Sequence, residues 1–81
     1  MNRLLRSNFS ADVQMELHVN GVRYNVAKTG PGYVVLADHA EIQGGPGMVR
    51  IVIDGREFRK SVIVDDYFPF DEFVTYEVID E

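Results

Sequence analysis

A regular alternation of apolar and polar residues on both sides of an Asn-Gly pair restricts the fold of this chain most. The segment VQMELHVNGVRYNV, residues 13–26, is apolar at every second position before Asn20-Gly21 and again after it. Asn-Gly favours a two-residue type I′ turn, because both central residues of that turn need a positive φ. With this turn the apolar side chains share one face, as a hairpin with one buried side requires. The expected pairs on that face are Val19 with Val22, Leu17 with Tyr24 and Met15 with Val26, and the polar face holds Gln14, Glu16, His18, Arg23 and Asn25.

A second hairpin of the same design is predicted later in the chain. The segment VRIVIDGREFRKSVIV, residues 49–64, alternates around Asp54-Gly55, which is another common type I′ pair. The parity of its apolar positions places them on one face, so we expect two hairpins that form a pseudo-symmetric pair. The apolar positions are Val49, Ile51 and Ile53 before the turn and Phe58, Val62 and Val64 after it.

Two shorter segments add further strands. YVVLA, residues 33–37, is apolar throughout, and EFVTYEVI near the end alternates, with Val74, Tyr76 and Val78 on one face. The intervening DHAEIQGG fits either one helical turn or a loop. About six short strands without a long helix predict an all-β fold, namely a small antiparallel barrel or sandwich built from two β-hairpins.

The chain is expected to form one domain, because 81 residues bury too little surface to supply two cores. We predict an N-terminal arm over residues 1–12 and a single β domain over residues 13–81. The chain has no cysteine, so its stability must come from packing or association. No segment resembles a signal peptide or a membrane span, and the expected location is therefore cytoplasmic.

Two Gly-Pro-Gly triplets, at residues 30–32 and 45–47, each lead into an apolar run that ends in Asp. Phosphate loops need several free amides at the start of a helix, or a Gly-Lys-Ser/Thr sequence. Neither condition is met here, and Pro31 and Pro46 remove amide donors that such a loop would use. Both triplets are therefore predicted to be turns.

The net charge of −5 argues against nonspecific binding to nucleic acid, which depends on basic residues that neutralise phosphates. Acidic residues gather in residues 65–81 and basic residues in residues 50–60, so we expect these segments to lie near each other. Arg50 and Arg59 are expected opposite or near each other, which is unfavourable unless an acid or a bound anion lies between them. The acidic C-terminal strand is their expected internal partner.

Catalytic and metal-binding patterns are weak. The DHAE segment, residues 38–41, has three metal-capable side chains, but neighbours on an extended chain point in opposite directions. His18 is expected to be a solvated neighbour of Arg23, and none of the three serines lies in a nucleophile motif. We therefore predict no enzymatic activity, no metal and no cofactor. A small enzyme is kept only as the third hypothesis for the function.

The segment DDYFPFDEF, residues 65–73, concentrates aromatic rings between acidic residues. These rings either plug an open end of the barrel or form an exposed anchor for a partner. Aromatic residues dominate the energetics of protein interfaces, and acidic residues at the rim of an exposed aromatic patch keep the protein soluble. The candidate partner-binding residues are Tyr67, Phe68, Phe70 and Phe73.

Over nearly its whole length the chain resembles the PilZ family of small β-barrels. The likeness lies in an arginine-bearing arm, a hairpin, a glycine-bearing turn before an apolar strand, and a Gly-Gly-Pro-Gly approach to a second hairpin. PilZ domains are receptors for cyclic di-GMP or, in degenerate members, protein-binding adaptors. They hold the nucleotide with an Arg-x-x-x-Arg arm and an Asp/Asn-x-Ser-x-x-Gly turn. The resemblance implies ligand-binding roles for Arg3, Arg6, Thr29 and Gly32.

The chain departs from the PilZ motifs at three points, one of which is the conservative replacement of the motif serine by Thr29. Its arm, Arg3-Leu4-Leu5-Arg6, is one residue shorter, and Ala27 stands where the family has Asp or Asn. We therefore expect a non-enzymatic interaction or adaptor module whose partner is another protein, a second copy of the chain included. A receptor for an anionic cyclic dinucleotide is the alternative, and neither a membrane nor nucleic acid is an expected partner.

Overall fold

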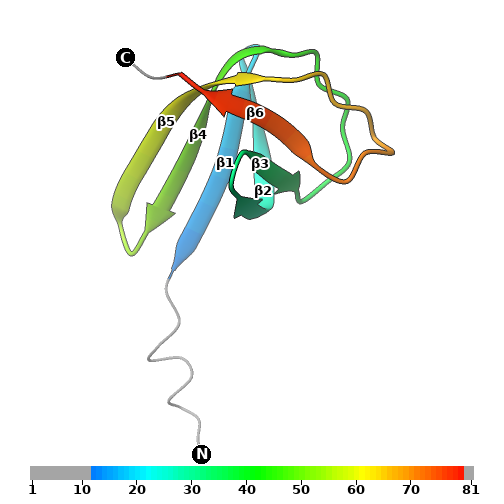
Figure 1. Cartoon of the computed structure of the whole chain (residues 1–81). Helices are drawn as coiled ribbons and strands as arrows, with labels where there is room; N and C mark the ends of the chain where they lie inside the picture. The colour runs from blue at the N-terminus through cyan, green and yellow to red at the C-terminus, as the bar shows by residue number, and fades with distance from the viewer. Residues whose placement is uncertain (1–11, 80–81) are drawn as a thin grey trace, which may run out of the picture.

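The computed structural model describes residues 12–79, and these residues form a closed antiparallel barrel of six strands (Figure 1). The order around the barrel is β1-β2-β3-β6-β5-β4, and β4 pairs with β1 to close it. This confirms the predicted all-β class and identifies the barrel as the correct alternative. No helix in this part of the chain is long and apolar enough to cross a membrane. The strands are β1 (Val13–Val19), β2 (Val22–Gly30), β3 (Tyr33–Leu36), β4 (Gly45–Ile53), β5 (Arg56–Val64) and β6 (Val74–Val78).

Both predicted hairpin turns are present. Asn20 and Gly21 have φ angles of 55° and 76°, and Asp54 and Gly55 have φ angles of 51° and 84°. Two consecutive residues with positive φ are the mark of a type I′ turn, which matches the twist of the strands it joins. The register of the first hairpin is also as predicted for two of the three pairs, since Val19 lies opposite Val22 and Leu17 lies opposite Tyr24. The third, Met15 with Val26, is not formed, because the pairing ends at Glu16 and Asn25.

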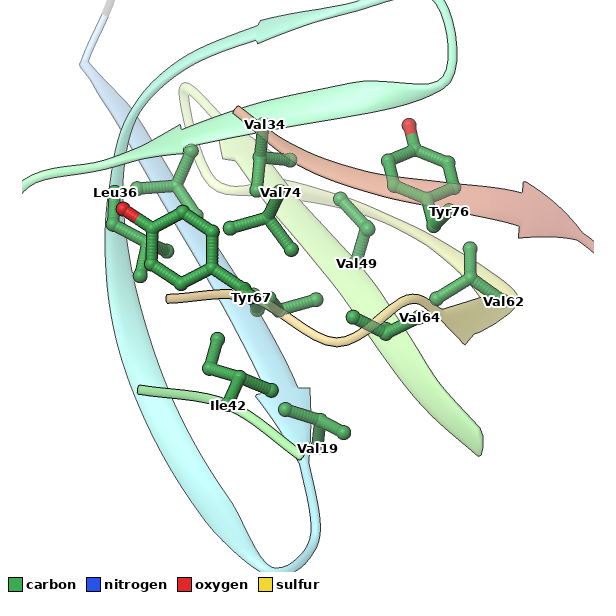
Figure 2. Packing of buried hydrophobic residues seen from close by; sticks show 12 residues of the cluster. Val19, Val34, Leu36, Ile42, Val49, Val62, Val64, Tyr67, Val74 and Tyr76 are labelled. Atoms are coloured by element: carbon green, nitrogen blue, oxygen red, sulfur yellow. The ribbon is translucent and has the colours of Figure 1, made fainter. Parts of the chain in front are cut away.

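The core lies inside the end of the barrel that is crossed by β6 (Figure 1). Two loop residues complete it, because Ile42 and Tyr67 are buried and exchange backbone hydrogen bonds of 2.9 Å in both directions. The DHAEIQGG segment is therefore a loop up to residue 44, which joins the core through Ile42, and its last glycine begins β4. Figure 2 shows the Tyr67 ring pointing into the cluster of apolar side chains. The buried residues are Leu17, Val19, Val26, Val34, Leu36, Ile42, Val49, Val62, Val64, Tyr67, Val74 and Tyr76.

The first Gly-Pro-Gly triplet is a turn, as predicted, but the second is not. Residues 45–47 form the start of β4, where Gly47 pairs with Val19 on one side and with Val62 on the other. A Cβ at residue 47 would lie only 2.6 Å from the carbonyl oxygen of His18. Pro46 is tolerated because its nitrogen faces the side of β1, beyond the last residue pair between β1 and β4. The missing amide is thus not needed.

The second hairpin is only partly buried, which differs from the sequence prediction. Strand β6 pairs with β5 only at residues 62–64, and β2 pairs with β1 only from Glu16 onwards. The turn of the β4–β5 hairpin and the start of β1 consequently extend beyond the closed end of the barrel (Figure 1). We call residues 13–15, 51–53 and 56–60 the distal sheet. Five residues predicted on inward faces are exposed, namely Val13, Val22, Ile53, Phe58 and Val78.

Candidate functional site

The loop between β5 and β6, residues 65–73, carries the predicted aromatic cluster, and we call it the aromatic loop. Its four aromatic residues do not form one surface. Tyr67 is only 3% exposed and belongs to the core, so it is not available to a partner. Phe73 is 43% exposed and packs edge-on against Tyr33, with the ring centroids 4.7 Å apart. Tyr67 thus has the plugging role, and Phe73 covers the start of β3.

Phe68 and Phe70 are the stacked pair of the aromatic loop. Their rings are stacked, with the centroids 5.7 Å apart and an angle of 7° between the planes. Phe70 is 85% exposed, and Phe68 is also exposed. The stacked rings therefore present a flat apolar surface to solvent.

The backbone around this pair is held in place by hydrogen bonds. The amide of Asp71 donates to the carbonyl oxygen of Phe68 at 2.8 Å, and the Asp71 carboxylate accepts from the Phe68 amide at 3.2 Å. Pro69, between the rings, further restricts the chain because its φ is fixed by the pyrrolidine ring. These bonds close the segment from Phe68 to Asp71, which contains both phenylalanines.

Acidic residues surround the base of the stacked pair. A cavity of about 200 Å³ beside it is lined by Glu41, Ile42, Gln43, Asp66 and Phe68. The Asp66 carboxylate accepts a hydrogen bond of 2.7 Å from the amide of Gly44, which ties the aromatic loop to the preceding loop. A partner that covers Phe68 would therefore meet carboxylates at the edge of its contact.

The opposed arginines of the second hairpin have an internal partner, but it is not the predicted one. Arg50 and Arg59 lie directly opposite each other on β4 and β5. The Glu57 carboxylate accepts a 2.6 Å hydrogen bond from Arg50 Nε and lies 3.3 Å from Arg59 Nε. Arg50 also donates to Glu16 of β1 at 3.1 Å. These arginines thus pair with acids of β1 and β5, whereas the C-terminal strand was expected.

This outward network extends along the polar face of the first hairpin. Glu16 is 2.9 Å from the ring nitrogen of His18 and 3.8 Å from Arg23. Its hydrogen bonds to His18 and Arg50 lower the pKa of Glu16, although partial burial opposes the shift. The hydrogen bond from Arg50 likewise lowers the pKa of Glu57. Both carboxylates are therefore held in the charged form, and each lies within 4 Å of two arginines.

The inner face of the distal sheet is the surface that sequence reasoning missed. Phe58 is 50% exposed there, and Arg56 lies over its ring, 5.9 Å from the centroid. On the other side of Phe58, Lys60 Nζ is 5.5 Å from the ring centroid of Tyr76. Arg56 and Lys60 have the same parity as the buried Val62, so two cations on an inward face were the signal that this part of β5 is exposed.

The residues assigned to a nucleotide by the family resemblance are only partly described. Arg3 and Arg6 lie outside the described residues. Thr29 is half-buried on β2 opposite Val34, and Gly32 lies in the following turn with a φ of 77°. The carbonyl oxygen of Gly32 accepts a hydrogen bond from the amide of Tyr76, so this turn helps to attach β6.

Comparison with known proteins identifies no relative of the chain. No family model, no curated protein and no solved structure matches the chain. The likeness to PilZ domains thus rests on the sequence features named above, and the surfaces described here carry the functional argument.

Proposed function

We propose that the chain is a non-enzymatic interaction module that binds another protein through the aromatic loop, with Phe70 as the anchor. The observation that carries this proposal is the stacked Phe68–Phe70 pair, which is held toward solvent on a loop fixed by Tyr67 and Asp71. Aromatic residues are enriched among the residues that dominate binding energy. An exposed stacked pair of this kind is typical of a binding surface rather than of a folding element.

The energetics favour the same role. Complete burial of a phenylalanine side chain is worth about 1.5–3 kcal/mol relative to leaving it in water. Folding does not gain this free energy at Phe70, because the ring stays exposed. A partner that covers the ring gains it, and since the loop is already ordered, little conformational entropy is lost on binding. The flanking carboxylates of Asp66, Asp71 and Glu72 favour a partner with basic residues around an apolar centre.

Capture of binding proteins from native lysate tests this function. The immobilised chain is compared with the variants Phe70→Ala and Phe58→Ala, each of which removes one exposed phenyl ring from a different end of the molecule. We expect Phe70→Ala to lose a protein that the parent and Phe58→Ala both retain, without a change in melting temperature. Equal capture by all three proteins would contradict the proposed role of the aromatic loop.

The same experiment separates the adaptor from the cyclic dinucleotide receptor. Each capture is repeated with added cyclic di-GMP, and the adaptor role predicts the same bound proteins with and without nucleotide. Gain or loss of a partner that depends on the nucleotide would favour the receptor instead.

A further inference from the structure

Strand β5 has an open edge in the distal sheet. Strand β4 pairs with β5 from Arg56 to Val64, whereas β6 pairs only with residues 62–64 and reaches Ser61 through the Ile79 amide. Within residues 12–79, no strand lies on the other side of residues 56–60. An open strand edge presents backbone donors and acceptors that can pair with another chain.

The register identifies the groups that this edge offers. Ile53 and Arg56 flank the two-residue turn and form a hydrogen-bonded pair, and such pairs alternate along an antiparallel ladder. Residues 56, 58 and 60 therefore direct their amides and carbonyls toward β4. Glu57 and Arg59 direct theirs to the open side. Two amides and two carbonyls are thus placed for an incoming strand.

The side chains beside this edge combine apolar surface with positive charge. Phe58 lies at the centre of the inner face, with Arg56 and Lys60 two residues away on either side. Neither of these cations forms an ion pair with any of residues 12–79. The inner face of the distal sheet contains no acid and consists of Val13, Met15, Ile51, Ile53, Arg56, Phe58 and Lys60.

We propose that the distal sheet is a second docking site, which binds an extended acidic segment of a partner protein as an added strand along residues 56–60 of β5. An apolar residue of the partner would cover Phe58, and carboxylates two positions away on either side would meet Arg56 and Lys60. Main-chain hydrogen bonds supply affinity in such strand addition, and alternate side chains supply specificity. This site goes beyond the proposed function, because it shares no residue with the aromatic loop.

The charge distribution favours a peptide over the other anionic partners. The chain carries a net charge of −5, which opposes long-range attraction to nucleic acid or to an anionic membrane. A short segment meets only the local cations, and it can also use the open backbone edge. If two β5 edges paired antiparallel about Phe58, Arg56 would lie opposite Lys60 of the second copy on the inner face, which is unfavourable, whereas Glu57 would lie opposite Arg59 on the outer face. The inner face of a second copy therefore supplies no acid to the two cations.

The test uses a palindromic peptide, so that either strand direction gives the same contacts. The probe is acetyl-Thr-Glu-Thr-Val-Thr-Glu-Thr-amide, and its matched control has lysine in place of each glutamate. Binding is followed by titration of backbone amide chemical shifts in the full chain. We expect shifts centred on Glu57 and Arg59, and binding of the lysine peptide that is about tenfold weaker, because two exposed attractive charge contacts become repulsive. Equal binding of the two peptides overturns the proposal.

Variants of the chain test the charges and the backbone edge separately. The double substitution R56E/K60E should reverse the preference between the two peptides. Arg59→Pro should abolish binding, because proline removes an amide on the open side and leaves the ladder with β4 intact. A peptide N-methylated at its valine and at both neighbouring threonines gives the same test without altering the protein. Unchanged binding of this peptide would exclude strand addition.

Other occupants of the face give distinct results. Association in sedimentation velocity that Phe58→Ala abolishes would show a second copy on this face, and flotation with phosphatidylserine vesicles that R56E/K60E abolishes would show a membrane surface. Either result overturns the proposal. Phe70→Ala should bind the acidic peptide as the parent does, so failure of this site and failure of the aromatic loop can be told apart.

Discussion

Arg50 and Arg59 lie directly opposite each other on neighbouring strands, and the carboxylate of Glu57 contacts both. Two like charges at directly opposed positions destabilise a sheet unless an acid compensates them. Glu57 and Arg59 are two positions apart on β5, so their side chains lie on the same face of the strand and can contact each other. Glu16 supplies the second carboxylate to Arg50 from the other neighbouring strand, β1.

This network predicts a dependence of stability on pH. The pKa values of Glu16 and Glu57 are lowered in the folded chain, so the folded state binds protons less readily than the unfolded state. The stabilisation is therefore present above the ordinary carboxylate pKa of 4.5 and is lost as the pH falls below it. We expect the melting temperature to drop from neutral pH to about pH 3, with a smaller drop for Glu16→Gln and Glu57→Gln.

Glu72→Gln is the matched control for this prediction, because Glu72 forms no ion pair with any of residues 12–79. Its melting temperature should follow that of the parent across the same pH range. If the variants of Glu16 and Glu57 also follow the parent, the network does not contribute to acid sensitivity.

Gly21→Val tests the first hairpin. Gly21 has a φ of 76°, and a Cβ there would meet no atom within 4 Å, so the effect of a side chain is backbone strain alone. A β-branched residue in this conformation should lower the free energy of unfolding by about 1–3 kcal/mol. Gly21→Asn is the control, since asparagine tolerates the left-handed region. Urea unfolding of both variants measures the difference.

Gly47→Ala tests the pairing of β1 with β4 through a steric clash rather than through backbone strain. The added methyl group would lie 2.6 Å from the carbonyl oxygen of His18 and 3.2 Å from the Cβ of Val19. Both atoms belong to β1, so the substitution should separate β1 from β4 and destabilise the fold by about 1–3 kcal/mol, as overpacking does. A melting temperature equal to that of the parent would show that the two strands are less closely paired.

Substitutions in the aromatic loop should differ in effect according to burial. Tyr67→Ala should destabilise by about 3–5 kcal/mol, because it removes a buried ring from the core. Phe70→Ala should change the free energy of unfolding by less than about 0.5 kcal/mol, because its ring is 85% exposed. Phe68→Ala should have an effect between those of Tyr67→Ala and Phe70→Ala, because its ring is only 42% exposed. Thermal melting combined with sedimentation velocity separates loss of folding from loss of association. A large loss of stability in Phe70→Ala would place that ring in the core.

Calorimetric titration with cyclic di-GMP is expected to show no saturable binding at tens of micromolar. The shortened arm and Ala27 remove contacts that the resemblance to PilZ domains would require. Arg3→Ala and Arg6→Ala are the controls, and binding that both substitutions weaken would reverse the order of the two functions.

The features predicted correctly from the sequence are those that depend on neighbours in the chain. The two type I′ turns follow from Asn20-Gly21 and Asp54-Gly55, and the register of each hairpin follows from its turn. Parity then places Leu17 and Val62 in the core, where both are completely buried.

The features that the sequence did not reveal depend on pairs of residues far apart in the chain. The parity of Phe58 is that of a core residue, but β6 is too short to extend over it, so the ring is exposed. The pairing of Arg50 with Glu16 requires β4 to lie beside β1, which no local pattern indicates. In the aromatic loop, the backbone bonds between Ile42 and Tyr67 decide which ring is buried.

The pairing of β1 with β4 also has a consequence for synthesis on the ribosome. The first hairpin is local and can form as soon as its two strands have emerged. The pairing of β1 with β4 is complete only after Ile53, the partner of Val13, has been synthesised. Until then, the edge of β1 that pairs with β4 is open, and Leu17 and Val19 lack the core residues of the later strands. Nascent chains with exposed edges and apolar faces are prone to aggregate. The interval between translation of the two hairpins is therefore the period in which this chain is most exposed to aggregation.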